Sequence, residues 1–462
     1  MLRIFRSPRA LTGAVAVLTA LLLGACQRAA PTAPGSNVIL VTIDTLRADH
    51  LGCYGYERAT SPRIDELAAR SVVFERAVST SSWTLPAHAS LLTGLYPAEH
   101  GVQTDVNAMP ASAVTLAELL GEHGYQTFAA VSHVYLSTRW GFDTGFDRFD
   151  ERVALGSPQR PVATHIVDSA IEWLAARDTE RPFFAWLHIF DPHWDYAPPP
   201  PFDTRFDPDY RGSMRGNYAS IKPYVKAVAG YDTPPPLAER DLEHLLALYD
   251  GEIAYVDTEL GRLFDALGAK RLWDSTVLVV ASDHGEEFME HGSLEGHQWT
   301  LYDEVVMVPL IAHFPGPRLQ GTRVGDVVST VGAAGMVLDY LGIDNGWRSL
   351  YPLLSGGPPR GLVGGEALLD LTVRRRERQL ALRTADAKLV RHDDGRTELY
   401  QLGVDPGEHE DVSVRSGDVV EALSARIDAN LARMKRLPDA GVERDAIGKR
   451  VRDRLKATGY LD

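Results

Sequence analysis

The chain has 462 residues, of which 45% are hydrophobic and 24% charged, and its formal net charge at pH 7 is −15. This composition is ordinary for a globular protein, and the length is enough for a large core or for two or three domains. So acidic a chain is a poor candidate for binding nucleic acid or an anionic lipid surface, and an anionic substrate would need a metal ion or a few local cations to attract it.

The first 25 residues differ from the rest. Three arginines precede an apolar run over residues 11–23, and no acidic residue interrupts it. This is the pattern of a secretory signal peptide, because the run is too short for a membrane span and small residues follow it. Leu-Gly-Ala-Cys at its end also resembles the lipobox of bacterial lipoproteins, in which the cysteine, here Cys26, is lipidated and becomes the mature N-terminus. The alternative is an ordinary cleaved signal with an incidental cysteine.

Residues 26–36 predict a lipidated, flexible tether, since they are small, contain prolines and carry a single charge, at Arg28. Gln27 after the cysteine fits sorting to the outer membrane by the rule known for such lipoproteins. We therefore expect the protein in a bacterial cell envelope, facing the periplasm or the outside, with the anchor as its only membrane contact. Loss of residues 1–25 removes three arginines and no acidic residue, which takes the net charge from −15 to −18. Cys53 would then have no partner for an intramolecular disulfide.

Two runs typical of buried strands end in aspartate. Residues 37–43 (NVILVTI) precede Asp44, and residues 275–281 (STVLVVA) precede Ser282 and Asp283. Continuous apolar, β-branched runs suit strands covered on both faces, as in a parallel sheet. Because sites in open α/β sheets form outside the carboxyl ends of the strands, these two ends predict a shared site. Further strand candidates are residues 71–74, 126–132, 182–190 and 308–314.

The stretch SSWTLPAHASLLTG (81–94) lies between these two runs in the sequence. Pro86 is tolerated in a first helical turn, so we expect a helix that begins near Thr84. The Thr84 hydroxyl would then lie at a helix N-terminus, where the backbone N–H groups and the dipole favour an anion. Taken alone, Thr84 could simply cap the helix. His88, one helical turn further on, should face the same site.

Helical periodicity fills the gaps between the strands, over residues 62–70, 115–124, 162–176 and 237–267. The alternation of strands and helices predicts one large α/β domain over residues 37–345. Residues 196–236 interrupt it with a proline-rich stretch that we interpret as an irregular insertion or lid. Residues 346–462 predict a C-terminal subdomain. Its expected elements are strands at residues 378–384, 388–391 and 398–402 and a helix over 417–437.

Several ordered motifs resemble the sulfatase family, which belongs to the alkaline-phosphatase superfamily. They are IDTLRADHLGCYGY (43–56), TLPAHASLLTGLYP (84–97), FDPH (190–193), SDHGEEF with EHG and GH (282–297) and ELYQLGVDPGE (398–408). The resemblance covers nearly the whole chain after residue 36. It implies a three-layer α/β/α sandwich with a mostly parallel central sheet, plus a smaller C-terminal α+β subdomain.

Matched residue by residue, Asp44, Asp283 and His284 fall where the family has its metal ligands. Thr84 falls on the nucleophile position beside the metal. Two carboxylates and an imidazole suit a divalent cation, and a hydroxyl oxygen can complete its coordination. We expect one zinc, manganese or calcium ion. Considered singly, each aspartate could cap a turn and His284 could be a core histidine.

The sequence departs from typical sulfatases at the nucleophile itself. They carry a cysteine or serine that is converted to formylglycine, with an arginine four places on, whereas this chain has Thr84 and His88. Threonine cannot be oxidised to the aldehyde. Ser132 stands near the place where many sulfatases have a sulfate-binding lysine. The threonine instead resembles the phosphodiesterase and phosphoethanolamine- or glycerophosphate-transferase branches, in which it attacks phosphorus.

These features predict a metal-dependent hydrolase that acts on phosphate mono- or diesters through Thr84. The substrate would be a small-molecule, glycan or lipid-headgroup ester. His88 could replace the missing arginine as substrate contact or acid. Two alternatives remain open, a sulfate-ester hydrolase that works without formylglycine and a non-catalytic binding lipoprotein that kept the fold.

Four further residues complete the expected site. His193 and His297 match positions that, in relatives, contact the transferred group, protonate the leaving group or bind a second metal, and Asp191 could join them as a ligand of a second ion. Arg47 is a candidate substrate contact, although pairing with a carboxylate such as Asp49 is the simpler expectation. For four other histidines we expect structural roles: His100, His188, His291 and His313.

Overall fold

The computed structural model describes residues 35–156, 162–225, 236–373 and 377–442. The predicted signal peptide, Cys26, most of the tether and the last 20 residues lie outside the described residues. Among the helices of the described part, none has both the length and the apolar character needed to cross a membrane.

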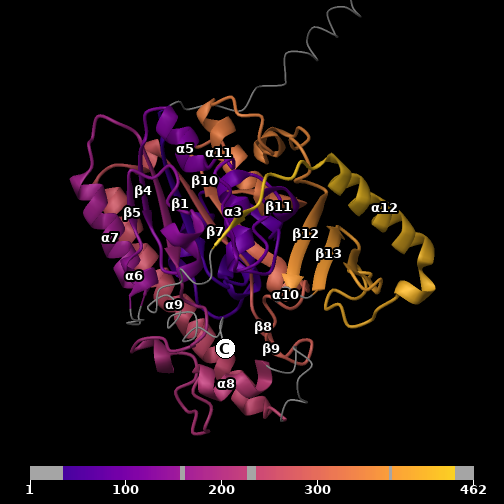
Figure 1. Cartoon of the computed structure of the whole chain (residues 1–462). Coiled ribbons are helices and arrows are strands. Elements are labelled where there is room, and N and C mark those ends of the chain that lie inside the picture. Colours follow the sequence, from indigo (N-terminus) through magenta and orange to yellow (C-terminus); the bar gives the residue numbers. More distant parts are fainter. Residues whose placement is uncertain (1–34, 157–161, 226–235, 374–376, 443–462) are drawn as a thin grey trace, which may run out of the picture.

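An eight-stranded sheet forms the centre of the molecule, in the order β11-β2-β10-β7-β1-β6-β4-β5 (Figure 1). Its strands are β1 (Asn37–Ile43), β2 (Val72–Val78), β4 (Gln126–Ala130), β5 (Arg148–Asp150), β6 (Phe183–Ile189), β7 (Thr276–Ser282), β10 (Met307–His313) and β11 (Thr322–Ser329). Neighbouring strands run parallel except where β10 pairs with β2 and β7. The predicted mostly parallel sheet is confirmed.

Helices cover both faces of this sheet. Ile39, Val41 and Ile43 of β1 belong to the core on one face, and Val38 and Leu40 to the core on the other. Helices α2 (Pro62–Ala68), α7 (Ala163–Ala176) and α9 (Glu239–Ala269) cover the first face, and α3 (Thr84–Thr93), α5 (Leu116–Glu122) and α11 (Ala333–Leu341) the second. Since successive side chains of a strand point to opposite faces, a strand between two cores must be apolar throughout. The predicted three-layer α/β/α arrangement is confirmed.

Shorter elements connect these layers. The short helices are α4 (Pro97–His100), α6 (Arg152–Leu155) and α10 (Asp303–Val306), and the 3₁₀ turns are η1 (Ala48–His50), η2 (Gly52–Tyr54), η3 (Val134–Leu136), η4 (Thr138–Trp140), η5 (Phe202–Thr204), η6 (Trp273–Ser275), η7 (Thr330–Gly332), η8 (Tyr351–Ser355) and η9 (Ser413–Arg415). The two-stranded pair β8 (Glu287–Phe288) and β9 (Leu294–Glu295) follows β7.

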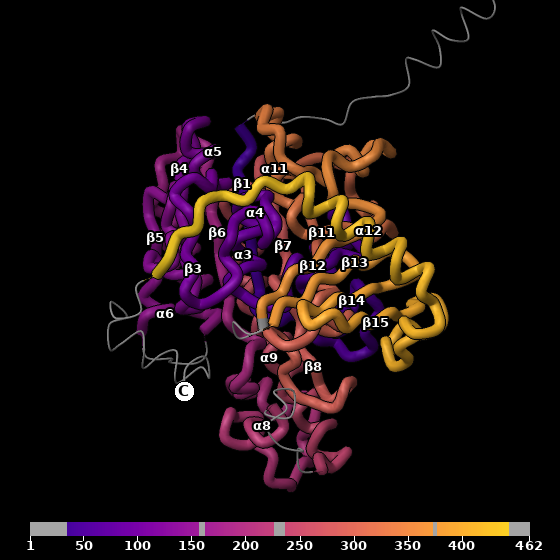
Figure 2. Tube along the Cα trace, turned by 45° about the vertical axis from the view of Figure 1, so that its right-hand side comes forward, coloured from indigo at the N-terminus to yellow at the C-terminus, as the bar shows by residue number. Residues whose placement is uncertain are grey.

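The C-terminal part forms a separate antiparallel sheet beside β11. Its strands are β12 (Glu366–Val373), β13 (Glu377–Thr384), β14 (Lys388–His392) and β15 (Thr397–Tyr400), and helix α12 (Gly417–Arg433) packs on β13 and β14. The N–H of Gly365 donates to the carbonyl of Val327 at 2.8 Å, which links the two sheets. After α12 the chain crosses back, and β16 (Ala440–Gly441) pairs with β3 (Asn107–Ala108) (Figure 2).

The stretch predicted as an irregular insertion contains helix α8 (Tyr218–Val225), so it is less irregular than expected. The N–H of Tyr196 donates to the carbonyl of Gly216 at 2.9 Å, and Trp194 stacks on Tyr218 at 4.6 Å. Helix α8 also packs against β9. Residues 226–235 of this stretch lie outside the described residues. The described part of the insertion therefore lies against the segment that follows β7.

Candidate active site

The site lies where parallel strands end side by side. Ile43, the last residue of β1, pairs in register with Ser282 of β7 and with Ile189 of β6. Asp44 and Asp283 therefore leave adjacent strands at the same level, and both are fully buried. The meeting of these two aspartates, expected from the strand pattern, is what the structure shows.

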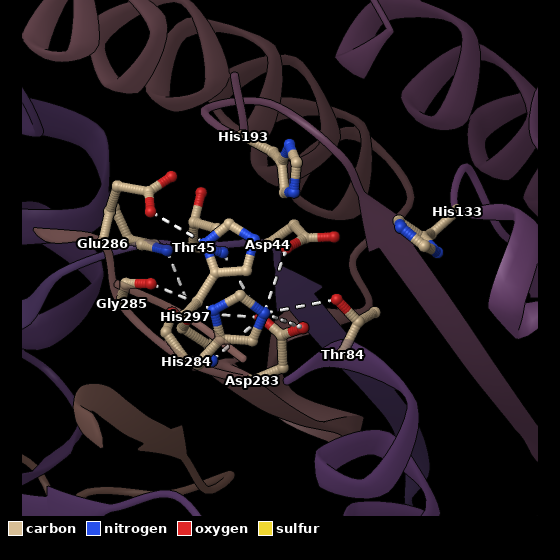
Figure 3. Close-up of polar contacts among 12 residues, drawn as sticks. Asp44, Thr45, Thr84, His133, His193, Asp283, His284, Gly285, Glu286 and His297 are labelled. Carbon is tan, nitrogen blue, oxygen red and sulfur yellow. Dashed lines mark hydrogen bonds and ion pairs between the residues drawn. The ribbon is translucent and has the colours of Figure 1, made fainter. Parts of the chain in front are cut away.

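Thr84 comes to the same place from helix α3. The helix begins at Thr84, after Trp83 in extended conformation, and all ten of its residues are buried. Thr84 is thus the first helical residue and not the N-cap. Its hydroxyl lies 3.2 Å from Nε2 of His284 (Figure 3). Tertiary packing, and not capping, therefore explains the position of this side chain.

His284 is oriented by its other ring nitrogen. Nδ1 contacts the carbonyl of Gly285 at 3.0 Å and must donate to it, so Nε2 carries the lone pair. Nε2 lies 3.7 Å from Oδ1 of Asp44 and 3.5 Å from Oδ2 of Asp283. Burial lowers the pKa of His284 to about 4, which keeps the ring neutral. Four ligands at about 2.1 Å around one zinc ion lie roughly 3.4 Å apart, close to these separations.

The carboxylates of this group lack the donors that burial demands. No hydrogen bond of ordinary geometry from the described residues reaches either oxygen of Asp44 or Oδ2 of Asp283. Burial and the neighbouring Asp283 raise the pKa of Asp44 well above its usual value. Unpaired buried carboxylates are costly unless a cation neutralises them. The donor set Asp44, Asp283, His284 and Thr84 therefore fits a divalent cation.

His88 lies beside Thr84, and both of its nitrogens are engaged. Nδ1 contacts the backbone carbonyl of Thr84 at 2.8 Å, and Nε2 contacts the hydroxyl of Thr42 at 3.0 Å. Burial lowers the pKa of His88, so the ring is neutral and does not supply the charge of an arginine. The His88 ring therefore has no free nitrogen for the expected role as a substrate contact or acid. Its contacts instead hold the start of α3 against β1.

His193 and His297 lie close to the metal-ligand group. Nδ1 of His193 donates to the carbonyl of Trp194 at 2.8 Å, and Nδ1 of His297 contacts Oε1 of Glu286 at 2.8 Å. The two rings are 5.1 Å apart, and the His297 ring lies 4.8 Å from that of His284. Figure 3 shows His193 above Asp44 and the His297 ring above that of His284. Burial lowers the pKa of His193 and His297 and raises that of Glu286.

Asp191 is directed elsewhere. Its Oδ2 accepts hydrogen bonds from the backbone N–H groups of Val162 (3.1 Å) and Ala163 (2.8 Å), at the start of α7. A carboxylate is favourable at a helix N-terminus, which explains this orientation. Among the described residues, Asp191, His193 and His297 do not bring three ligand atoms within 4.8 Å of one another. The set expected for a second metal ion is thus not assembled.

Each of the three guanidinium nitrogens of Arg47 is paired with a carboxylate. Its Nε and Nη2 donate to Asp49 at 2.9 and 2.7 Å, and Nη1 donates to Glu290 at 2.5 Å and to the carbonyl of Glu286 at 3.0 Å. The pairing with Asp49 was expected from the sequence. The alternative role of Arg47 as a substrate contact has no support in these contacts.

Sequence analysis missed two residues of this site. Glu286 contacts His297, and its other oxygen accepts a hydrogen bond from the Tyr196 hydroxyl at 3.1 Å. His188, assigned a structural role, places Nε2 only 3.5 Å from Oδ2 of Asp44. His88, His188 and Asp283 form a second group of candidate ligand atoms. The available signal was a histidine inside an otherwise apolar strand, next to the end at which a site was expected.

Comparison with known proteins gives a consistent result. The sulfatase family model matches residues 36–343. The chain is 26% identical over 331 residues to the ulvan-active sulfatase of Formosa agariphila, covering 66% of this chain and 61% of the relative. It is 25% identical over 346 residues to human iduronate 2-sulfatase, covering 64% and 62%. The matched part thus spans about three fifths of these two relatives.

Solved structures share the fold. The phosphonate monoester hydrolase of Agrobacterium radiobacter superposes with a TM-score of 0.71 at 22% identity, covering 86% of this chain and 96% of that one. A protein solved with its substrate D-glucosamine-2-N,6-O-disulfate gives a TM-score of 0.72 at 21% identity, covering 86% and 97%.

Proposed function

The chain belongs to the sulfatase family of hydrolases, and from this premise we propose that it cleaves phosphate mono- or diesters through Thr84. The observation that carries the proposal is the placement of the Thr84 hydroxyl at the start of α3, 3.2 Å from His284 and beside two buried aspartates. A threonine cannot become formylglycine, so the aldehyde chemistry of typical sulfatases is not open to it. An oxygen nucleophile that attacks phosphorus needs no such conversion.

The donor atoms present suit the metal ion that membership of the family implies. Asp44, Asp283 and His284 would hold it, with the Thr84 oxygen beside it. A bound divalent cation supplies positive charge that lowers the pKa of a neighbouring hydroxyl and offsets the negative charge of the transferred group. Zinc, manganese and calcium are the candidates.

The chain's own residues account for the rest of the reaction. The Thr84 oxygen attacks phosphorus, the Thr84 O–H bond breaks with its proton passing to solvent, and the bond from phosphorus to the leaving oxygen breaks. The leaving oxygen takes up a proton from an imidazole, and His297 is the candidate donor. A protonated Glu286 that donates to Nδ1 of His297 leaves the ring proton on Nε2, and solvent restores that proton after transfer. Water then attacks the phosphothreonine, the bond from phosphorus to the Thr84 oxygen breaks, and Thr84 regains its proton. His193 is the candidate base for that water.

A second candidate function is sulfate-ester hydrolysis without formylglycine. It is favoured by the names of the curated relatives, which include an N-acetylglucosamine-6-O-sulfatase from Bacteroides thetaiotaomicron that is 24% identical over 481 residues. A sulfothreonine lacks the elimination route that an aldehyde hydrate offers, so it would turn over slowly. A non-catalytic role is disfavoured, because a scaffold without chemistry does not need three buried ligand residues and a hydroxyl around one point.

The natural substrate is proposed as a small-molecule, glycan or lipid-headgroup ester, met at the cell envelope. This location rests on the N-terminal sequence, which favours a lipid anchor at Cys26. With the anchor as the sole membrane contact, the acidic chain would not itself adhere to anionic lipid.

The test is an activity panel on the purified protein with aryl phosphate, phosphodiester, phosphonate and sulfate esters, with each metal and with chelator. We expect phosphoesterase activity that chelator abolishes. Thr84→Ala should lower kcat on the order of 10³-fold or more, while Thr84→Ser, which loses only a methyl group, should keep much of it. Thr93→Ala is the matched control, a buried threonine at the other end of the same helix.

Mass spectrometry supplies the second readout. An acid quench during turnover should trap a phosphate adduct that maps to the peptide containing Thr84 and that is absent from Thr84→Ala. Sulfatase activity without phosphoesterase activity would instead establish the second candidate function.

A further inference from the structure

His188 shares a face of the sheet with the metal-ligand group. On β6 it pairs in register with Thr42 of β1, and Asp44 lies two residues beyond Thr42 on the same side. Trp186, two residues before His188, points to the same face and donates to the Thr42 hydroxyl at 3.1 Å. His188 is fully buried. The strand register, and not chance proximity, therefore places this imidazole next to Asp44.

The hydrogen bonds of Ser132 fix the tautomer of His188. The Ser132 hydroxyl contacts the carbonyl of His188 at 2.7 Å and Nδ1 of the same residue at 3.0 Å. A carbonyl can only accept, so the single hydroxyl proton of Ser132 goes to it. Nδ1 must then donate to the Ser132 oxygen. The proton is therefore on Nδ1, and Nε2 is left with a lone pair.

That lone pair faces a carboxylate. Nε2 of His188 lies 3.5 Å from Oδ2 of Asp44, and neither atom has a hydrogen-bond partner among the described residues. Two buried acceptors that face each other repel unless a cation lies between them. His284 has the same arrangement, with Nδ1 donating to a carbonyl and Nε2 facing Oδ1 of Asp44. Such an orienting bond at the second nitrogen is typical of histidines that bind metal.

We propose that His188 is a protein ligand of the divalent cation, through Nε2 and next to Oδ2 of Asp44. The inference rests on the metal dependence proposed above but not on the substrate. His88, which belongs to the same group of candidate atoms, is not a ligand, because its Nε2 is occupied by the Thr42 hydroxyl and its Nδ1 by the Thr84 carbonyl.

A second imidazole has a consequence for the choice of metal. Imidazole suits zinc and other transition metals, whereas calcium prefers oxygen ligands. A site with His188 and His284 beside two carboxylates and a hydroxyl should therefore bind zinc more tightly than calcium. Of the three ions expected from the sequence, calcium becomes the least suited.

The first experiment needs no variant. Zinc K-edge X-ray absorption on the purified wild-type protein, loaded with one zinc ion per chain, counts the imidazoles around the metal. We expect two imidazoles. A spectrum that requires only one imidazole per zinc would overturn the proposal.

The second experiment measures zinc and calcium dissociation constants by competition with a chelator. His188→Ala should raise the zinc Kd more than 100-fold and the calcium Kd much less. Ser132→Ala, which removes the acceptor of the Nδ1 proton, should raise the zinc Kd roughly 10- to 100-fold. His100→Ala is the matched control, a fully buried histidine also bonded to a serine, Ser90 (3.1 Å), and not part of either ligand group. Its zinc Kd should stay within threefold of wild type.

A zinc Kd of folded His188→Ala within threefold of wild type would show that the imidazole only lines the site, and it would overturn the proposal. If His188→Ala does not fold, the wild-type absorption spectrum and Ser132→Ala still decide. A wild-type protein that binds no divalent ion would refute the proposed function as well. A wild-type protein that binds zinc and cleaves esters, with one imidazole on the metal, would refute only the role of His188.

Discussion

Lys388 provides a sharp test of how the two sheets are held together. It is fully buried on β14. Its Nζ donates to Oδ1 of Asp303 (2.8 Å) and to the carbonyl of Leu301 (2.8 Å), and it forms an ion pair with Oε1 of Glu408 (2.7 Å). Asp303 and Leu301 belong to the segment that leads from the candidate active site into β10. Lys388→Met keeps most of the side-chain volume and removes the charge and all three donors.

The expected decrease in the free energy of unfolding follows from the groups that Lys388→Met leaves unpaired. Asp303 keeps a salt bridge to Arg383 at 3.1 Å, and 19% of its side chain is exposed. The Glu408 side chain is only 1% exposed and loses its cation. Removal of one partner of a buried ion pair costs about 3–5 kcal/mol, and we expect a decrease of this size in the free energy of unfolding near pH 8.5. Arg391→Met is the matched control, since Arg391 lies on the same strand and its ion pair with Asp428 of α12 is solvent-exposed, so it should contribute less than about 1 kcal/mol.

Lowering the pH should reduce the destabilisation caused by Lys388→Met. Burial raises the pKa of Glu408 to about 7, and without the attraction of Lys388 it should rise further. A carboxyl whose folded-state pKa is raised stabilises the fold at low pH and loses that contribution as the pH rises through the folded pKa. Urea unfolding followed by tryptophan fluorescence should therefore give a smaller deficit for Lys388→Met at pH 6 than at pH 8.5. Lys388→Met combined with Glu408→Gln should recover most of the loss at pH 8.5. A deficit below 1 kcal/mol at pH 8.5, or one independent of pH, would refute the reasoning.

Three further predictions concern the site and the anchor. Asp283→Asn should lower metal content and turnover together, because a charged ligand is lost; elemental analysis showing wild-type metal content would contradict the assignment. Gly285→Ala should destabilise the fold by at least about 1–3 kcal/mol and weaken metal binding, since an added Cβ would lie 2.1 Å from the carbonyl oxygen of Glu304; an unchanged urea midpoint would show that the loop adjusts freely. Cys26→Ser should move the protein from the membrane to the soluble fraction in cell fractionation without changing turnover, and equal membrane retention would exclude lipidation.

Strong local patterns in the sequence were enough to predict much of the fold. The continuous apolar run of β1 and that of β7, each followed by aspartate, indicated both the buried sheet and the place of the site. Edge strands were harder. β11 was not predicted, because its sequence TRVGDVVS contains a glycine and exposes Arg323 and Asp326, as a strand at the margin of a sheet can. The antiparallel direction of β10 depends on tertiary pairing, which no local pattern encodes.

In the candidate site too, some residues could be predicted from local patterns and others could not. Thr84 and His284 could be assigned because they lie within recognisable motifs. His188 could not, because its proximity to Asp44 depends on the register between β1 and β6 and its tautomer depends on Ser132, 56 residues earlier. The orientation of Asp191 toward α7 likewise follows from the packing of that helix. Spacing identifies residue types that can act, but only the fold decides which nitrogen or oxygen faces which neighbour.

The C-terminal part of the chain contacts the rest of the molecule at three places. Gly365 bonds to β11, Lys388 reaches Asp303, and β16 returns to β3 beyond α12. A part of a protein attached at one place can tilt, and a part attached at two places can rotate about the line between them. Contacts at three places oppose a rigid rotation of the C-terminal part, because such a rotation would break at least one of them. An opening that admits substrate would then come from other segments, and the described part of the insertion, which packs on β9, is one of them.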